Sequence, residues 1–403
     1  MRNPILPWAF AAGCVLSCTG ADWLQFRGND GTGASTETGL PTAWDVKTNQ
    51  HVAWRADLPG RGPSSPIVVQ GKVIVTCSSG PRQDRLHVLC FDARTGERLW
   101  ERQFWATGRT FCHPTSAIAA PTPASDGELI FAFYSSNDLA CLDLDGNLQW
   151  YRGLGLDYPA AGNDVGMAAS PVVMGGTVIV QVECLGESFA TGLDKQTGET
   201  RWWHAREQAM NWTSPGVVRD PAGGNELVLL QSPSRISAHQ PATGEEVWSL
   251  ETRCEVISSP FTDGRLIFIP ASGLTAVRRD AQGPSPEIIW QETKLSSGSC
   301  SPVVHQGLVY TLNNAGVLNC GNAQTGNVEW QLRLKGRFWA NPVIAGGHLY
   351  AVNQDGLAFV VRLGDKGEIV SQPDFGEPIF GTPAAADGAL FFRSDAHLWR
   401  ISQ

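Results

Sequence analysis

Residues 92–100 read Asp92-Ala93-Arg94-Thr95-Gly96-Glu97-Arg98-Leu99-Trp100 and form one copy of a repeat. The Thr-Gly pair predicts a tight hairpin turn, because glycine adopts positive φ without steric cost. The tryptophan that follows offers a large apolar surface and a single N–H donor. A turn and tryptophan of the same kind return at 194–202, so we treat the stretch as the end of a repeating unit.

Upstream of that turn, each unit opens with a small residue and a proline and continues as β-branched runs separated by glycine turns. A proline suits the first residue of a strand, because it has no N–H to donate to the ladder. The opening prolines are 66, 123, 171, 215, 260, 302, 342 and 383, and the gaps between them are 57, 48, 44, 45, 42, 40 and 41 residues. The closing tryptophans are Trp100, Trp150, Trp202, Trp248, Trp290 and Trp330. This spacing is typical of a four-stranded propeller blade, and the short β-branched runs exclude a helical repeat.

The two ends of the chain predict a closed ring. The unit after Pro383 ends before its last strand, whereas His51–Asp57 resembles a last strand without the three before it. Trp54 precedes Trp100 by 46 residues, which is one repeat. We therefore predict an all-β fold, an eight-bladed β-propeller of four-stranded antiparallel blades, whose last blade is closed by the N-terminal strand. Seven blades with added decoration is the alternative.

The N-terminus predicts export. Arg2, the apolar run from Ile5 to Leu16 and the small residues before Asp22 are typical of a signal peptide. We predict a signal peptide over 1–21, a single propeller domain over 22–403 and a periplasmic location. Lipidation at Cys14 or Cys18 is the alternative and the one route to membrane association, since no later run is long enough to span a bilayer.

Composition limits the partners. The net charge is −9 and charged residues are 17% of the chain, without basic blocks, so nucleic acid is not an expected partner. Eight cysteines follow residue 21, and none has zinc-site spacing. Cys90, Cys141 and Cys320 share one repeat position and are expected to be small buried hydrophobes. Cys77 with Cys90 is the one candidate disulfide.

The repeat resembles that of the pyrroloquinoline-quinone (PQQ) type found in quinoprotein dehydrogenases and in the outer-membrane assembly factor BamB. Residues 92–100 carry the resemblance, together with Asp22-Trp23-Leu24-Gln25-Phe26-Arg27-Gly28 and the stretch from Val52 to Pro66. The resemblance covers nearly the whole mature chain. It implies the propeller fold and two kinds of function, because this fold hosts enzymes and scaffolds alike.

An enzyme of this family would need PQQ, a Ca²⁺ site of oxygen ligands and a carboxylate base. The adjacent cysteine pair of the alcohol-oxidising members is absent, as is a Cys-x-x-Cys-His haem site. Glu183, Asn211 and Asp164 are conceivable calcium ligands, but their spacing follows no ligand pattern and we expect solvated loop and strand-end residues. We predict no catalytic residue, no metal site and no cofactor, with a small PQQ- and Ca²⁺-dependent alcohol or sugar dehydrogenase as the alternative.

A scaffold would bind through the loops that link one blade to the next, which emerge on one face of the ring. Several of these loops are rich in aromatic and cationic residues, the types enriched at interface hot spots. The sequence therefore predicts that this face binds a protein or a small ligand. The candidate binding residues are Trp105, Arg109, His113, Trp212, Arg337 and Trp339. The partner and the oligomeric state are not specified by the sequence.

Overall fold

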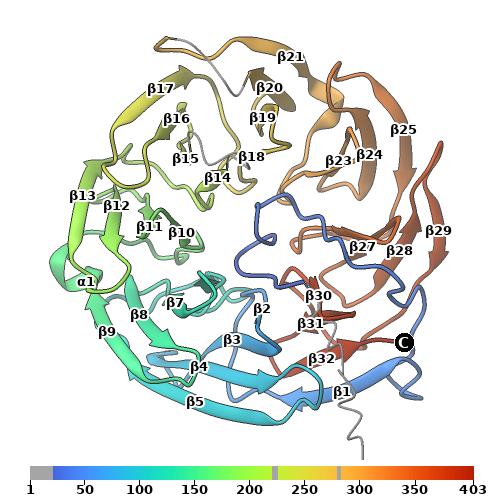
Figure 1. Cartoon of the computed structure of the whole chain (residues 1–403), viewed down its shortest axis with the longest axis horizontal. Helices are drawn as coiled ribbons and strands as arrows, with labels where there is room; N and C mark the ends of the chain where they lie inside the picture. Colours follow the sequence, from blue (N-terminus) through green and yellow to red (C-terminus); the bar gives the residue numbers. More distant parts are fainter. Residues whose placement is uncertain (1–20, 220–225, 279–282) are drawn as a thin grey trace, which may run out of the picture.

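The computed structural model describes residues 21–219, 226–278 and 283–403. Apart from the short helix α1 (Leu154–Asp157) and a 3₁₀ turn at Thr293–Leu295, its regular structure is all strand. The described residues form eight four-stranded antiparallel sheets, which stand around a central axis as the blades of a propeller (Figure 1). The predicted fold class is confirmed.

In blades one to seven the strands follow chain order from the axis outward, so the fourth strand is outermost (Figure 1). Blades one to three comprise β2 (Ile67–Val69), β3 (Lys72–Ser79), β4 (Arg85–Asp92) and β5 (Arg98–Trp105); β6 (Ala124–Ser125), β7 (Leu129–Phe133), β8 (Asp138–Asp143) and β9 (Leu148–Gly153); and β10 (Val172–Met174), β11 (Thr177–Val182), β12 (Phe189–Asp194) and β13 (Thr200–Ala205). Blades four and five comprise β14 (Gly216–Val218), β15 (Leu227–Gln231), β16 (Arg235–His239) and β17 (Glu246–Glu251); and β18 (Phe261–Thr262), β19 (Leu266–Ile269), β20 (Leu274–Arg278) and β21 (Ile288–Glu292). Blades six and seven comprise β22 (Val303–His305), β23 (Leu308–Leu312), β24 (Val317–Asn322) and β25 (Val328–Arg333); and β26 (Val343–Ala345), β27 (His348–Val352), β28 (Ala358–Arg362) and β29 (Glu368–Ser371).

Blade eight joins the two ends of the chain, as predicted. Its inner strands are β30 (Ala384–Ala386), β31 (Ala389–Arg393) and β32 (His397–Ile401), and its outer strand is β1 (Val52–Asp57). The pairing of β1 with β32 is antiparallel and sets Trp54 opposite Arg400. The N-terminal strand therefore covers what would otherwise be an open edge.

The repeat tryptophans form hydrogen bonds from one blade to the next. The indole Nε1 of Trp54 donates to the Ala93 carbonyl at 3.0 Å, and that of Trp150 donates to the Lys195 carbonyl at 3.0 Å. The same bond joins Trp100 to Leu144, Trp202 to Pro241, Trp290 to Ala323 and Trp330 to Gly364. For Trp248, the corresponding turn includes residues 279–282, outside the described part of the chain. Each bond crosses a seam between blades, so the repeat gains its stability from its neighbours.

In blades one to six, the residue paired with the seam tryptophan on the neighbouring strand is small. Cys90 pairs with Trp100, Cys141 with Trp150 and Cys320 with Trp330, which confirms the shared repeat position of these cysteines. Their thiols are buried, and burial raises the pKa of Cys90 and Cys141 to about 12. They are therefore protonated, unreactive packing groups.

The candidate disulfide does not form, because Cys77 and Cys90 lie on opposite faces of their sheet. Cys77 on β3 is paired with His87 on β4, and His87 is three residues before Cys90. Successive side chains of a strand point to opposite faces, so a separation of three residues puts Cys77 and Cys90 on different faces. Cys77 packs with blade eight and Cys90 with blade two. All eight cysteines of the described residues are free thiols.

The turn glycines offer a direct test of the seam. A Cβ on Gly198 would lie 2.7 Å from the Trp150 ring, whereas a Cβ on Gly71 would have nothing within 4 Å, although both residues have positive φ. We expect Gly198→Ala to lower the free energy of unfolding by about 1–3 kcal/mol more than Gly71→Ala does, because only the first overpacks a seam. Urea-induced unfolding of the two variants measures the difference, and equal losses would show that the turn contributes φ strain alone.

Two sequence-based expectations fall outside the described residues. The signal peptide over 1–21, with the alternative lipidation sites Cys14 and Cys18, lies in 1–20 except for its last residue. The rewritten turn of the fifth unit lies largely in 279–282. No helix among the described residues is long and apolar enough to cross a membrane.

Candidate functional site

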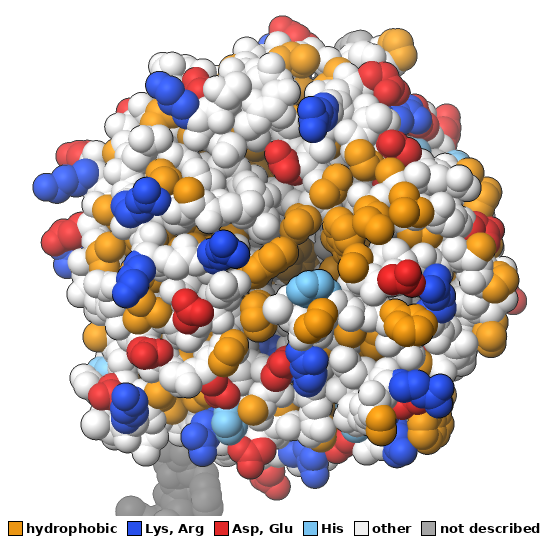
Figure 2. All heavy atoms as spheres, turned by 180° about the vertical axis from the view of Figure 1, so that it is seen from behind, with side chains coloured by type: hydrophobic (Ala, Val, Ile, Leu, Met, Phe, Trp, Pro, Cys, Tyr) orange, Lys and Arg blue, Asp and Glu red, His pale blue; other side chains and the backbone are white. Residues whose placement is uncertain are grey.

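A cavity of about 430 Å³ lies on the propeller axis and opens at one face of the ring. Figure 2 shows that face, with a central hollow bordered by hydrophobic side chains. Every connection between the last strand of one blade and the first strand of the next contributes to the wall. In chain order, these contributions are Pro63; His113, Thr115 and Ser116; Val165 and Ala168; Trp212; Ile257; Ser299; Trp339; and Phe380. The blade-linking loops therefore meet at one mouth.

The N-terminal segment lies across the other end of the axis (Figure 1). The Trp23 backbone bridges to Val68 of β2 in blade one, and the backbone of Ala34 bridges to Ile344 of β26 in blade seven. Phe26, between these anchors, lines the cavity. The segment thus supplies the floor of the cavity, and the motif at residues 22–28 has a structural role that the sequence did not specify.

The side chain of Arg27 attaches this floor segment to the blades. Its side chain is buried, donates to the Pro302 carbonyl and lies 5.0 Å from the centre of the Phe261 ring. Burial lowers the pKa of the guanidinium to about 9, which leaves the group charged at neutral pH. A buried cation in this position holds the floor to blades five and six through a carbonyl and an aromatic face.

A belt of seven hydroxyl groups and one amide, called the hydroxyl belt below, surrounds the axis between the floor and the mouth. It is formed by the residue that precedes each opening proline: Ser65, Thr122, Ser170, Ser214, Ser259, Ser301, Asn341 and Thr382. From Thr122 to Thr382, the side-chain oxygen at each belt position accepts a hydrogen bond from the backbone N–H of the equivalent residue in the preceding blade. Examples are Ser170 N–H to Ser214 Oγ at 2.9 Å and Ser214 N–H to Ser259 Oγ at 3.0 Å. This hydroxyl belt links the blades at the axis as the tryptophans do near the rim.

The cavity wall carries almost no charge. It contains no Lys, Arg, Asp or Glu, and His113 is its one titratable side chain. The His113 Nδ1 lies 2.8 Å from the Thr115 hydroxyl. Apolar walls with a few convergent polar groups are typical of small-ligand pockets, and the volume lies within their usual range.

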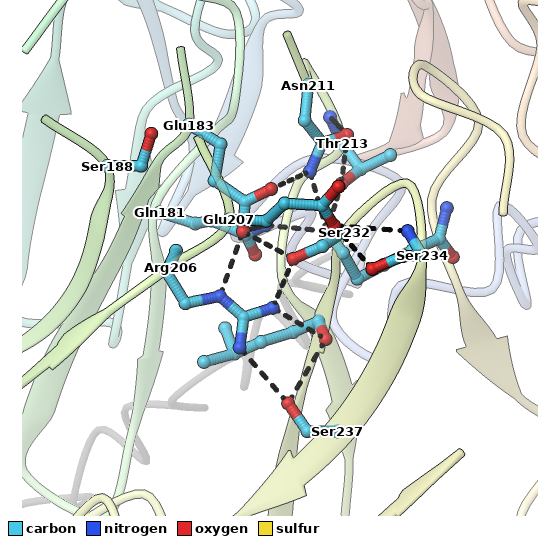
Figure 3. Close-up of polar contacts among 12 residues, drawn as sticks. Gln181, Glu183, Ser188, Arg206, Glu207, Asn211, Thr213, Ser232, Ser234 and Ser237 are labelled. Carbon is cyan, nitrogen blue, oxygen red and sulfur yellow. Dashed lines mark hydrogen bonds and ion pairs between the residues drawn. The ribbon is translucent and has the colours of Figure 1, made fainter. Parts of the chain in front are cut away.

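A buried ion pair positions one aromatic residue of the wall (Figure 3). Glu183 accepts from Arg206 Nε at 2.8 Å and from Asn211 Nδ2 at 2.9 Å. Thr213 donates to the Asn211 side chain at 3.0 Å. Residues 211 and 213 flank Trp212, whose indole donates to the Gly166 carbonyl at 2.8 Å. The Glu183–Arg206 pair therefore holds the loop that carries Trp212 into the cavity.

The expectation that Glu183 and Asn211 are solvated was wrong. They are 1% and 2% exposed, because they belong to this internal network between blades three and four. Burial raises the pKa of the Glu183 carboxyl, and the charge of Arg206 opposes the rise. Asp164 is elsewhere, paired with Arg109 at 2.7 Å.

These carboxylates do not suit Ca²⁺. The Glu183 oxygens already accept from Arg206, Ser232, Gln181 and Asn211, so a guanidinium occupies the position that a metal ion would need. Among the described residues, no group of three or more His, Cys, Asp or Glu side chains could hold a metal ion. The cavity wall likewise has no Lys or Arg to meet the carboxylates of PQQ.

The structure divides the six predicted binding residues into two sets. His113, Trp212 and Trp339 line the central cavity. Trp105 stacks against Arg85 at 4.2 Å, at the end of the outer strand β5, while Arg109 pairs with Asp164. Neither these two nor Arg337, which is exposed on the loop before β26, is part of the wall. Sequence reasoning missed Phe26, Phe380 and the hydroxyl belt, although the repeated Ser or Thr before proline was a visible signal for the belt.

A family model described as outer membrane protein assembly factor BamB matches residues 28–186, 160–277 and 274–367. The chain belongs to this family. The matches span most of the propeller, including every blade-linking loop of the cavity except the one that carries Phe380. Comparison with curated proteins finds no significant match to the chain.

Solved structures of two functional kinds resemble this member of the BamB family. BamB from Moraxella catarrhalis is 18% identical, with a TM-score of 0.63 over 87% of this chain and 97% of that one. A europium-containing methanol dehydrogenase is 14% identical, with a TM-score of 0.70 over 93% and 90%. The quinohemoprotein alcohol dehydrogenase from Comamonas testosteroni is also 14% identical, with a TM-score of 0.70 over 94% and 80%. At such identities the likeness concerns the fold, and function has to be argued from the site.

Proposed function

We propose that this chain is an exported, non-enzymatic scaffold of the periplasm that binds its partner at the mouth of the central cavity, in a role like that of BamB in outer-membrane protein assembly. The observation that carries the proposal is the convergence of all eight blade-linking loops on one apolar mouth, with the N-terminal segment behind it. A rigid ring that presents loops on one face suits recognition.

The internal pairing of Glu183 favours this function over dehydrogenation. A quinoprotein site requires oxygen ligands that are free to take Ca²⁺, whereas both Glu183 oxygens are engaged by donors from the chain itself. The likeness to the dehydrogenase structures keeps a PQQ-dependent oxidoreductase as the second candidate.

Paired substitutions test the mouth. Trp339 is 45% exposed at the cavity and Trp105 is 61% exposed at the rim, so each can be truncated without opening a core. We expect Trp339→Ala combined with His113→Ala to weaken capture of periplasmic assembly proteins at least tenfold, since central aromatic residues dominate binding. Trp105→Ala combined with Arg109→Ala is the matched control and should leave capture unchanged.

Two outcomes would contradict the proposal. One is equal recovery of the partner by wild-type protein and by the mouth variant. The other is saturable binding of PQQ with Ca²⁺, accompanied by dye-linked oxidation of an alcohol or a sugar.

A further inference from the structure

One contact closes the floor segment into a loop. The segment bridges to blade one at Trp23 and to blade seven at Ala34. It then turns back, and its two ends meet where the backbone N–H of Ala21 donates to Glu37 Oε1 at 3.0 Å. The nitrogen of Ala21 therefore lies against a carboxylate that is sixteen residues further along the chain.

This contact lies where the ring closes. The other oxygen of the same carboxylate, Glu37 Oε2, accepts from the Gly388 N–H at 3.1 Å, in the β30–β31 turn of blade eight. The residue after Ala21 reaches blade one, since Asp22 Oδ1 accepts from the Gln70 N–H at 2.9 Å, in the β2–β3 turn. The two ends of the floor segment thus join the first and last blades on the face opposite the mouth.

The chemical state of the Ala21 nitrogen decides how strong the contact is. Inside a longer chain this nitrogen is an uncharged amide with one N–H. Hydrolysis of the Gly20–Ala21 peptide bond leaves a carboxylate on Gly20 and an amine on Ala21, which takes up a proton at neutral pH. The ammonium adds a Coulombic attraction to the hydrogen bond, so a single cleavage converts the contact into an ion pair with Glu37.

The residues around this bond suit cleavage. Small residues occupy positions 19–21, as they do at the cleavage site of a signal peptide. The boundary expected from the sequence falls one bond later, after Ala21. The structure favours keeping Ala21 in the mature chain, because its nitrogen already lies within hydrogen-bond distance of Glu37.

We propose that removal of residues 1–20 during export leaves Ala21 as the first residue, and that its ammonium group forms a terminal ion pair with Glu37 that holds the floor segment across the axis. The inference rests on export, which is part of the proposed function, and deepens it, because the floor segment places Phe26 in the cavity. Processing thereby stabilises the floor of the partner-binding cavity. In the precursor an uncharged hydrogen bond holds the same floor, so the floor opens more often.

The first residue of the exported protein is the first test. The full-length chain is expressed with its own N-terminus and recovered from the periplasm, and N-terminal sequencing with intact mass identifies the start. We expect Ala21. A protein that begins at Asp22, or at a lipidated Cys18, overturns the proposal.

Four mature chains measure the terminal ion pair itself. Two begin with a free Ala21 and two with N-acetyl-Ala21, whose acetyl group restores the amide and removes the charge; one of each pair carries Glu37→Gln. Amide exchange at Ile344, whose N–H donates to the Gly33 carbonyl at 2.9 Å, reports release of the floor segment from blade seven. We expect acetylation to speed this exchange about threefold when Glu37 is present, as suits an exposed ion pair, and to have no effect in Glu37→Gln.

Two exchange results would count against the ion pair. Equal exchange in the free and acetylated chains that retain Glu37 would show that the terminal charge contributes nothing. An equal acceleration in Glu37→Gln would show that the acetyl group acts through its bulk. Added salt gives a further check, because 1 M NaCl screens exposed charges and should abolish the threefold difference, whereas a difference that persists in salt is steric and overturns the proposal.

The capture experiment separates this inference from the proposed function. If the exported protein begins at another residue but the mouth variant still loses its partner, the terminal ion pair fails and the scaffold role stands. If Ala21 is first and exchange behaves as expected, but the mouth variant captures its partner as well as the wild type does, the scaffold role fails and the ion pair stands. Recovery of the uncut chain outside the periplasm would refute export, and the terminal ion pair with it.

Discussion

Glu183→Gln is expected to lower the free energy of unfolding by about 3–5 kcal/mol, because it leaves the Arg206 charge buried without its counter-ion. The side chains of Arg206 and Glu183 are 5% and 0% exposed, so solvent cannot replace the lost carboxylate. The substitution also weakens the hold on Asn211 and hence on the loop of Trp212. We therefore expect weaker binding at the cavity mouth as well as lower stability. Urea-induced unfolding and the capture experiment measure the two effects.

An exposed ion pair provides the matched control. Arg362 and Glu368 are 2.9 Å apart, with side chains 58% and 57% exposed, and Glu368→Gln should cost no more than about 1 kcal/mol. The double variant Glu183→Leu with Arg206→Met should recover much of the stability lost in the single variant, since it removes both charges together. A single variant as stable as the wild type would show that Glu183 is not the counter-ion of Arg206.

A chain that begins at residue 58 is expected not to fold into a cooperative, monomeric propeller. It lacks β1, so the backbone of β32 becomes an open edge and the seam between blades eight and one loses Trp54. Trp54 lies against Gly96 in blade one, and the closing strand also packs with the core between blades seven, eight and one. The loss is comparable with the whole net stability of a domain, which is about 5–15 kcal/mol.

A chain that begins at residue 47 is the control, because it lacks the same N-terminal floor segment but keeps β1. We expect it to remain folded, with a less stable cavity and a cooperative transition in circular dichroism. Size-exclusion chromatography should show a monomer for this chain and aggregates for the shorter one. If the shorter chain were equally cooperative and monomeric, closure by β1 would not be the source of ring stability.

Much of the fold could be predicted because its determinants are local and repeated. Each feature of the repeat, namely its Thr-Gly turn, its opening proline and its seam tryptophan, acts within one unit or on the unit beside it. A single copy such as 65–100 is therefore enough to predict how one blade forms and how it packs on the next. The 46 residues from Trp54 to Trp100 predicted the closing strand for the same reason. The candidate disulfide was wrong because repeat position identifies the strand of Cys77, while its face depends on the register with β4.

The candidate site was predicted only in part. Loop composition identified His113, Trp212 and Trp339, but it also included Trp105, Arg109 and Arg337. Aromatic and cationic residues look alike in sequence whether they turn toward the axis or toward the rim. Glu183 and Asn211 were considered as metal ligands, although their spacing followed no ligand pattern. In the structure Glu183 instead accepts hydrogen bonds from both Arg206 and Asn211.

The sequence by itself determined the blade, the number of blades and the way the ring closes, because a repeated pattern of turn, strand and seam residue is stable only when its neighbours cover both faces. Tertiary structure alone decided that the N-terminal segment crosses the axis, that eight hydroxyl-belt positions encircle it and that Glu183 meets Arg206. Those contacts join residues from different blades, and their geometry exists only once the circle is complete. A residue's chemistry can be read along the chain, but the group it faces across the axis depends on the closed ring.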